Sequence, residues 1–312
     1  MSSKRDIAII ICSRGREAYL SRLVGDIDSN FAPALEAGGM SVCTFVYAQH
    51  YPAAFLTSLA HTFASAIAQE RLVIIEAQQS HQRIGDVFAT AIAAIHERTD
   101  YRLAMLMDDD SLYYADPVID ENLRQAARDF LVHEDRAYSI KLGQNKALEY
   151  APFIDPEGPI MPFKEKMQWA SRAVLDEVLA LPRFAELSIG EDVVISAVAW
   201  RGGAERCFGV HGIASFLHLG FEPDGDAPGG AIAGGYGALV GYEEGASQPT
   251  ELGKELGKYE SAFRSGVTMQ DILPEIFVGP DHPHYTISGI RPAAVARYGA
   301  SGSCRRRLHQ AR

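Results

Sequence analysis

Three consecutive aspartates, Asp108, Asp109 and Asp110, directly follow the apolar run 103–107. Carboxylates packed this closely repel one another, and burial at the mouth of a strand adds to that cost. A bound divalent cation offsets the repulsion, because hard cations take oxygen ligands. Residues i and i+2 of an extended segment point to the same side, so Asp108 and Asp110 can face one site. The alternative is an acidic turn in which Asp110 or Ser111 caps a following helix.

Two more carboxylates, Glu191 and Asp192, follow Gly190 at the start of an expected helix that ends at Gly202. Acidic side chains at a helix N-terminus interact favourably with the helix dipole, and an isolated pair there needs no further role. This pair stands between the aspartate triplet and a later histidine, His218. The order of the acidic motifs therefore favours a functional site over two separate helix ends.

The elements that must position these residues alternate between strand and helix in the first 110 residues. Short apolar runs predict four strands, at 7–12, 42–47, 72–75 and 103–107. Apolar stripes at helical spacing predict the helices between them, at 20–27, 53–69 and 84–95, the last with Ser80 as its cap. Such alternation predicts an α/β fold with a largely parallel sheet flanked by helices. Ligands of such sheets bind beyond the carboxyl ends of the strands, where both 13–16 and 108–110 are expected to lie.

The rest of the chain is less regular. Helices are predicted at 123–131, 174–179 and 194–199, and a strand at 139–142. Residues 224–245 contain eight glycines and show no periodicity. This stretch predicts few buried contacts and a mobile lid that orders over a bound ligand.

Composition argues against several other classes of protein. The chain has 312 residues, 47% of them hydrophobic, and a formal net charge of -11, which argues against a nucleic-acid partner. Its four cysteines show no CxxC spacing, so neither a disulfide framework nor a structural zinc site is expected. No apolar run approaches the roughly 18 residues of a membrane helix, and the apolar stretch near the N-terminus is too short for a signal peptide. We therefore expect a cytoplasmic protein with no integral membrane segment.

Three segments, in this order along the chain, resemble motifs of the GT-A fold glycosyltransferases, especially the family-two group. Residues 7–16 (IAIIICSRGR) are similar to the opening strand and nucleotide-binding loop of that family. Residues 105–110 (MLMDDD) look like its DxD motif, and residues 190–203 look like its Glu-Asp motif with the following helix. The resemblance implies a GT-A type sheet and transfer of a sugar from a nucleoside diphosphate sugar, a UDP-sugar, with Mn²⁺ or Mg²⁺ as cofactor.

The metal-binding roles are assigned by position within these motifs. The resemblance implies that Asp110 binds the cation and that Asp108 shares the metal or contacts the ribose. His218 would complete the metal site, with His211 as the second choice. Asp109 is counted with the nucleotide-sugar-binding residues, because a triplet lets the register of the motif shift by one.

The other nucleotide-sugar-binding residues that the resemblance implies are Ser13, Arg14, Arg16, Arg83 and Asp86. For the last two the helix start would face the base and ribose, but this chain lacks the family's usual Ala-Arg-Asn lettering there. Trp169 lies where the family often lines the acceptor pocket, and a core tryptophan is the alternative. The acceptor stays open between a glycan, a lipid carrier, a peptide and a small metabolite.

The Glu-Asp motif predicts the stereochemistry. An inverting transferase needs a general base for the acceptor hydroxyl. Glu191 and Asp192 offer two carboxylates where the similar, retaining polypeptide N-acetylgalactosaminyltransferases carry Glu-Asn. We therefore expect an inverting enzyme in which Asp192 is the base and Glu191 holds an acceptor hydroxyl, although neighbours at a helix start could exchange these roles.

These assignments divide the chain into three parts. Residues 1–110 form the expected nucleotide-sugar-binding half and 111–223 the metal- and acceptor-binding half of one domain, while 224–312 hold the expected lid and a C-terminal extension. One alternative is a sugar-phosphate nucleotidyltransferase, although residues 13–16 have a single glycine where that class has a glycine-rich loop. Another is a non-catalytic binding protein whose acidic clusters are solvated caps.

Overall fold

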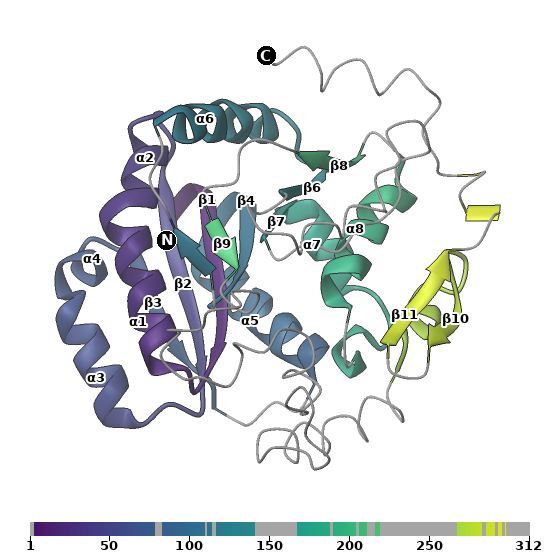
Figure 1. Ribbon diagram of the computed structural model, residues 1–312, viewed down its shortest axis with the longest axis horizontal. Coiled ribbons are helices and arrows are strands. Elements are labelled where there is room, and N and C mark those ends of the chain that lie inside the picture. The colour runs from purple at the N-terminus through teal and green to yellow at the C-terminus, as the bar shows by residue number, and fades with distance from the viewer. Residues whose placement is uncertain are drawn as a thin grey trace, which may run out of the picture.

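The computed structural model describes residues 3–78, 83–109, 111–113, 117–140, 167–187, 190–203, 206–210, 216–218, 267–282, 285–290, 293–294 and 297. Its main sheet has seven strands, which are in spatial order β3 (Leu72–Glu76), β2 (Val42–Gln49), β1 (Ser3–Arg14), β4 (Thr99–Asp108), β7 (Met167–Ser171), β6 (Ala137–Ile140) and β8 (Cys207–Val210). Figure 1 shows this sheet running through the middle of the molecule.

The sheet is mostly parallel, as predicted. β1 pairs in parallel with β2 on one side and with β4 on the other, and β2 pairs in parallel with β3. β7 is antiparallel to both of its neighbours, β4 and β6, whereas β6 and β8 are parallel to each other. Because β7 runs backwards, its first residue, Met167, lies beside Met107 near the carboxyl end of β4. The α/β class with helices flanking a mostly parallel sheet is therefore confirmed.

Helices cover both faces of the sheet (Figure 1). One face carries α1 (Glu17–Asp26), the π-helical turn η1 (Ile27–Phe31), α2 (Ala32–Glu36), α3 (Ala53–Thr62), α4 (Ala64–Ala68) and α6 (Pro117–Leu131). The other face carries α5 (Ile84–Arg98), α7 (Arg172–Leu179) and α8 (Glu191–Arg201). Among the helices the structure describes, none is long and apolar enough to cross a membrane.

Successive side chains of β1 point to opposite faces of the sheet and contribute to both hydrophobic cores. Ile7, Ile9 and Ile11 lie in the cluster with α1 to α4, while Ala8 and Ile10 lie in the cluster with α5, α7 and α8. All five are at most 1% exposed. Burying each isoleucine stabilises the fold by about 1.5–3 kcal/mol. An apolar residue at every position of this run is what a strand covered on both faces requires.

Two predicted helices differ from those observed. The helix expected at 53–69 is interrupted at Phe63, whose backbone (φ -105°, ψ 26°) separates α3 from α4. The helix expected at 84–95 begins after Arg83 as its N-cap, so the cap predicted at Ser80, which lies outside the described residues, is wrong. The expected lid at 224–245 also lies outside the described residues.

The C-terminal segment joins the main core. It contains α11 (Met269–Ile272), with a capping box between Thr268 and Asp271, and the hairpin of β10 (Phe277–His282) and β11 (Tyr285–Ile290). Val267 forms an isolated β-bridge with Leu187. Six residues of this segment are buried in the core cluster that also contains α5, α7 and α8, namely Val267, Met269, Ile272, Leu273, Ile276 and Phe277.

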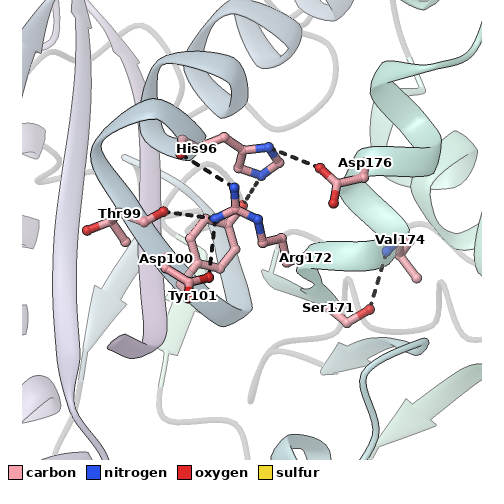
Figure 2. A network of polar contacts seen from close by, with 8 residues as sticks. All are labelled: His96, Thr99, Asp100, Tyr101, Ser171, Arg172, Val174 and Asp176. Carbon is pink, nitrogen blue, oxygen red and sulfur yellow. Dashed lines mark hydrogen bonds and ion pairs between the residues drawn. The ribbon is translucent and has the colours of Figure 1, made fainter. Parts of the chain in front are cut away.

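A polar network closes the amino edge of the sheet between α5 and α7 (Figure 2). The imidazole of His96 contacts the Tyr101 hydroxyl (2.6 Å) through Nε2 and the Asp176 carboxylate (3.2 Å) through Nδ1. Arg172 donates to the carbonyl oxygen of Thr99 (2.8 Å), and its guanidinium lies over the Tyr101 ring. Burial lowers the pKa of His96, and the positive charge of Arg172 lowers it further, against the smaller effect of Asp176.

We expect this network to make folding pH-dependent through His96. Since its folded pKa lies below the unfolded value of about 6.5, the unfolded chain binds more protons between the two values. Stability is therefore lost as pH falls through that window, by up to about 1.4 kcal/mol per pH unit. Urea unfolding of wild type and His96→Gln at several pH values measures this. The variant should lose less stability on acidification, and identical slopes would contradict the assignment.

Candidate functional site

The carboxyl ends of three neighbouring strands meet at one edge of the sheet. Cys12 of β1 is in register with Asp108, the last residue of β4. Arg14, the last residue of β1, is in register with Gln49, the last residue of β2. The predicted nucleotide-binding loop and Asp108, the first residue of the aspartate triplet, therefore lie side by side.

Asp109 is turned into the protein and is 0% exposed. Its carboxylate accepts a hydrogen bond from the Ser13 hydroxyl and forms an ion pair with the Arg16 guanidinium. The Ser13 hydroxyl also contacts the Tyr51 hydroxyl, which accepts a hydrogen bond from the Arg16 backbone N–H (3.1 Å). The direct nucleotide contact predicted for Asp109 is not supported, because the protein surrounds its carboxylate.

The same arrangement changes the roles predicted for the first loop. The hydroxyl of Ser13, a residue that is 2% exposed, bonds with Asp109 and Tyr51 inside the protein. The Arg16 guanidinium forms an ion pair with Asp109 and lies over the Tyr19 ring, 5.7 Å from the ring centre. Of the three residues predicted here, Arg14 alone is exposed, and it remains the candidate for a phosphate contact.

The two acidic motifs meet around Cys12. Burial raises the pKa of the Cys12 thiol, and the negative charges of Asp108, Glu191 and Asp109 raise it further, in that order. Glu191 begins α8, and Asp108 ends β4. Asp108 is in register with Cys12, and Gln168, the partner of Leu106 in β4, donates to the backbone carbonyl of Asp192, so both acidic motifs lie at this edge of the sheet. The thiol itself stays protonated and is no candidate nucleophile.

The start of α5 lies at the same edge. Arg83, the N-cap residue, is exposed, and Asp86 lies in the first helical turn. Tyr47 of β2 packs with Val87, the residue after Asp86, so the first turn of α5 lies against β2. Burial raises the pKa of Tyr47. Gly85 brings this turn against the neighbouring backbone, because its N–H donates to the Leu187 carbonyl (2.9 Å).

Hydrogen bonds from β7 hold the start of α8 in place. Gln168 donates from its side-chain amide to the backbone carbonyl of Asp192 (2.9 Å) and to the Ser196 hydroxyl (2.6 Å). The Asp192 carboxylate accepts the N–H of Val193 (2.8 Å), and Asp192 is 9% exposed. Gly190 precedes the helix with a φ of +90°, a conformation that favours glycine. These bonds thus hold the backbone at the start of α8 and the Asp192 carboxylate.

A short second sheet sets the backbone of His218 beside Ser111, the residue that follows the triplet in the sequence. β5 (Ser111–Tyr113) pairs antiparallel with β9 (Phe216–His218), and Ser111 is in register with His218. A strand follows the triplet, so the alternative of a helix-capping turn is wrong. Asp110 and His211 lie outside the described residues.

The donor chemistry fits a hard divalent cation. The predicted ligands are carboxylates and one imidazole, a set that suits Mn²⁺ or Mg²⁺. Within the described part of the chain, no three side chains of His, Cys, Asp or Glu converge as a metal site. The cation site stays a prediction.

Trp169 does not face the site. It lies on β7, is 0% exposed, and packs edge-on against Phe130 at 5.8 Å between ring centres. The prediction that Trp169 forms a platform for the acceptor is therefore wrong. Its indole belongs to the core between the sheet and α6, which was the alternative prediction.

Sequence reasoning missed two residues that shape this edge. Tyr51 comes two residues after the end of β2, where the rule for parallel sheets places ligand-binding residues, and that position could have identified it. Gln168 has no such signal, because β7 is short and was not predicted as a strand.

Comparison with known proteins identifies no family for this chain. No family model matches the sequence, and no curated protein matches it either. Among solved structures, the fold is similar to residues 1–349 of TarS from S. aureus, with 12% identity over 86% of this chain and 81% of that one and a TM-score of 0.48. A second structure of the same protein, in complex with UDP, has 11% identity over 83% of this chain and 70% of that one, with a TM-score of 0.46.

Proposed function

We propose that this protein is a GT-A type glycosyltransferase that moves a sugar from a nucleoside diphosphate sugar, a UDP-sugar, to an acceptor hydroxyl. One observation carries the proposal: the two acidic motifs are joined through β7, because Gln168, which is in register with Leu106 of β4, donates to the backbone carbonyl of Asp192 (2.9 Å). Two acidic motifs that meet at the carboxyl edge of a parallel sheet are what this chemistry needs. One motif serves the departing diphosphate, and the other serves the acceptor.

The proposed metal ligands are Asp108, Asp110 and His218. The register of β5 with β9 supports the last of these, because it sets the His218 backbone beside the residue that follows Asp110. When bound, Mn²⁺ or Mg²⁺ would neutralise charge on the departing diphosphate. Arg14, exposed at the end of β1, is the proposed phosphate contact from this chain.

The proposed base is Asp192. As the acceptor oxygen bonds to the anomeric carbon and the bond to the diphosphate breaks, the acceptor proton passes to the Asp192 carboxylate. Glu191 would hold the acceptor in place by accepting a hydrogen bond from another of its hydroxyl groups. Attack from the face opposite the diphosphate inverts the anomeric centre.

The metal role is tested by calorimetry with UDP. Wild type should bind UDP with manganese and lose most of that affinity in the presence of a chelator. Asp108→Asn should bind at least roughly tenfold more weakly, since a charged ligand interaction of about 1.4 kcal/mol or more is lost. Asp100→Asn is the matched control, because Asp100 lies on the same strand at the opposite edge and its side chain is 61% exposed. Equal affinity with and without metal would exclude the proposal.

Activity assays separate the alternatives. The proposed enzyme should slowly hydrolyse a UDP-sugar to UDP and free sugar in a metal-dependent way. Release of pyrophosphate from UTP and a sugar phosphate would instead identify a nucleotidyltransferase.

A further inference from the structure

We infer that Asp109 and Tyr51 are positioning residues that lock the first loop to the aspartate triplet and leave Asp108 and Asp110 as the carboxylates that serve the cation. The inference rests on the proposed function for its metal and nucleotide. It resolves the register that three identical residues leave open in the sequence.

The hydrogen bonds around Asp109 form a ring with a defined direction. A carboxylate only accepts, so the Ser13 hydroxyl donates to Asp109. Because the single proton of that hydroxyl is used, the Tyr51 hydroxyl donates to Ser13, and the Arg16 N–H donates to Tyr51. Burial raises the pKa of Tyr51 to about 12, so its proton is present at neutral pH. The Arg16 guanidinium closes the ring on the Asp109 carboxylate.

This ring ties three strand ends together. Ser13 belongs to β1, Tyr51 follows β2, and Asp109 follows β4. A fully buried carboxylate is stable only with a charged or hydrogen-bonding partner, so Asp109 keeps the loop that contains Arg16 in place. The Asp109 carboxylate is therefore used in contacts within the protein. Its neighbours in the sequence, Asp108 and Asp110, are the proposed ligands of the cation.

The test compares two buried tyrosines. Tyr51→Phe removes the hydroxyl from the ring of hydrogen bonds. It keeps the aromatic side chain that stacks on Phe55, with 5.1 Å between ring centres. Tyr101→Phe is the matched control, since it removes the bond from a buried hydroxyl to His96 (2.6 Å) at the opposite edge. Both variants should lower the Tm. In Tyr51→Phe alone, the Arg16 amide should exchange faster, and the affinity for UDP with manganese should fall roughly fivefold.

Asp109→Asn provides a second variant of nearly the same size. The amide keeps an oxygen for Ser13 but loses the ion pair with Arg16, so the affinity for UDP with manganese should fall roughly 30-fold. Hydrogen exchange at residues 13–16 should also increase, because the loop loses its anchor.

The outcomes of the two hypotheses are distinct. If wild type does not bind UDP with any divalent cation, the proposed function fails, while faster exchange in both ring variants would still establish Asp109 and Tyr51 as the residues that position the loop. If wild type binds UDP and both ring variants bind it as tightly as Tyr101→Phe does, the inference is overturned and the proposed function stands. Unchanged exchange at residues 13–16 would overturn it independently.

Discussion

Asp192→Asn is expected to lower kcat by roughly two to four orders of magnitude, the usual contribution of a general base. The amide cannot take the acceptor proton, but its oxygen can still accept the N–H of Val193, as the carboxylate does at 2.8 Å. The Asp192 backbone carbonyl that receives Gln168 is unchanged. The fold and the affinity for UDP with manganese should therefore stay near those of wild type.

Glu191→Gln is the companion variant. It should mainly raise KM for the acceptor, because Glu191 is proposed to bind an acceptor hydroxyl other than the one whose proton Asp192 removes. A large loss of kcat in Glu191→Gln with near-normal turnover in Asp192→Asn would exchange the two roles. NMR of the product gives the stereochemical test, and a glycoside with the configuration of the donor would exclude the inverting mechanism.

Gly85→Ala is expected to destabilise the fold by about 3 kcal/mol or more, because backbone must move to admit one methyl group. A Cβ at Gly85 would lie 2.0 Å from the carbonyl oxygen of Phe184 and 2.9 Å from the Cβ of Leu187. The Gly85 N–H also donates to Leu187, so α5 cannot shift without losing that bond. Urea unfolding measures the loss.

Gly25→Ala is the matched control for this prediction. Gly25 lies within α1, and its nearest neighbour to a new Cβ is the Phe63 ring at 3.8 Å, an ordinary contact. Alanine there should leave stability unchanged or raise it by about 0.5–1 kcal/mol. If both variants unfold alike, close approach of the backbone is not what selects glycine at position 85.

The first half of the fold could be predicted because its strands show a clear apolar pattern in the sequence. The run 7–12 is apolar at nearly every position, which is typical of a strand covered on both faces, and β1 contains it. β7 was missed for the opposite reason. Gln168 and Trp169 come after a segment of sequence with four prolines, 151–162, and no alternation of apolar and polar residues marks the strand.

The candidate site could be located from the sequence but not oriented. The carboxyl ends of parallel strands place residues 13–16 and 108–110 together on general grounds. Three identical aspartates carry no information on which one turns inward, and that depends on Tyr51, which is 58 residues before Asp109 in the chain (109 minus 51). Trp169 shows the same limit, since an aromatic ring suits a sugar platform and a core equally well.

The C-terminal segment also bears on how this chain folds during synthesis. The strands of the main sheet are complete at Val210, but residues 267–277, which complete the core on the face with α5, α7 and α8, emerge from the ribosome later. The face with α1 to α4 can close on β1 to β4 early, whereas the opposite face keeps apolar side chains uncovered until Val267 reaches Leu187. Chains released short of this segment would expose that face, and such surfaces are prone to aggregate and bind chaperones.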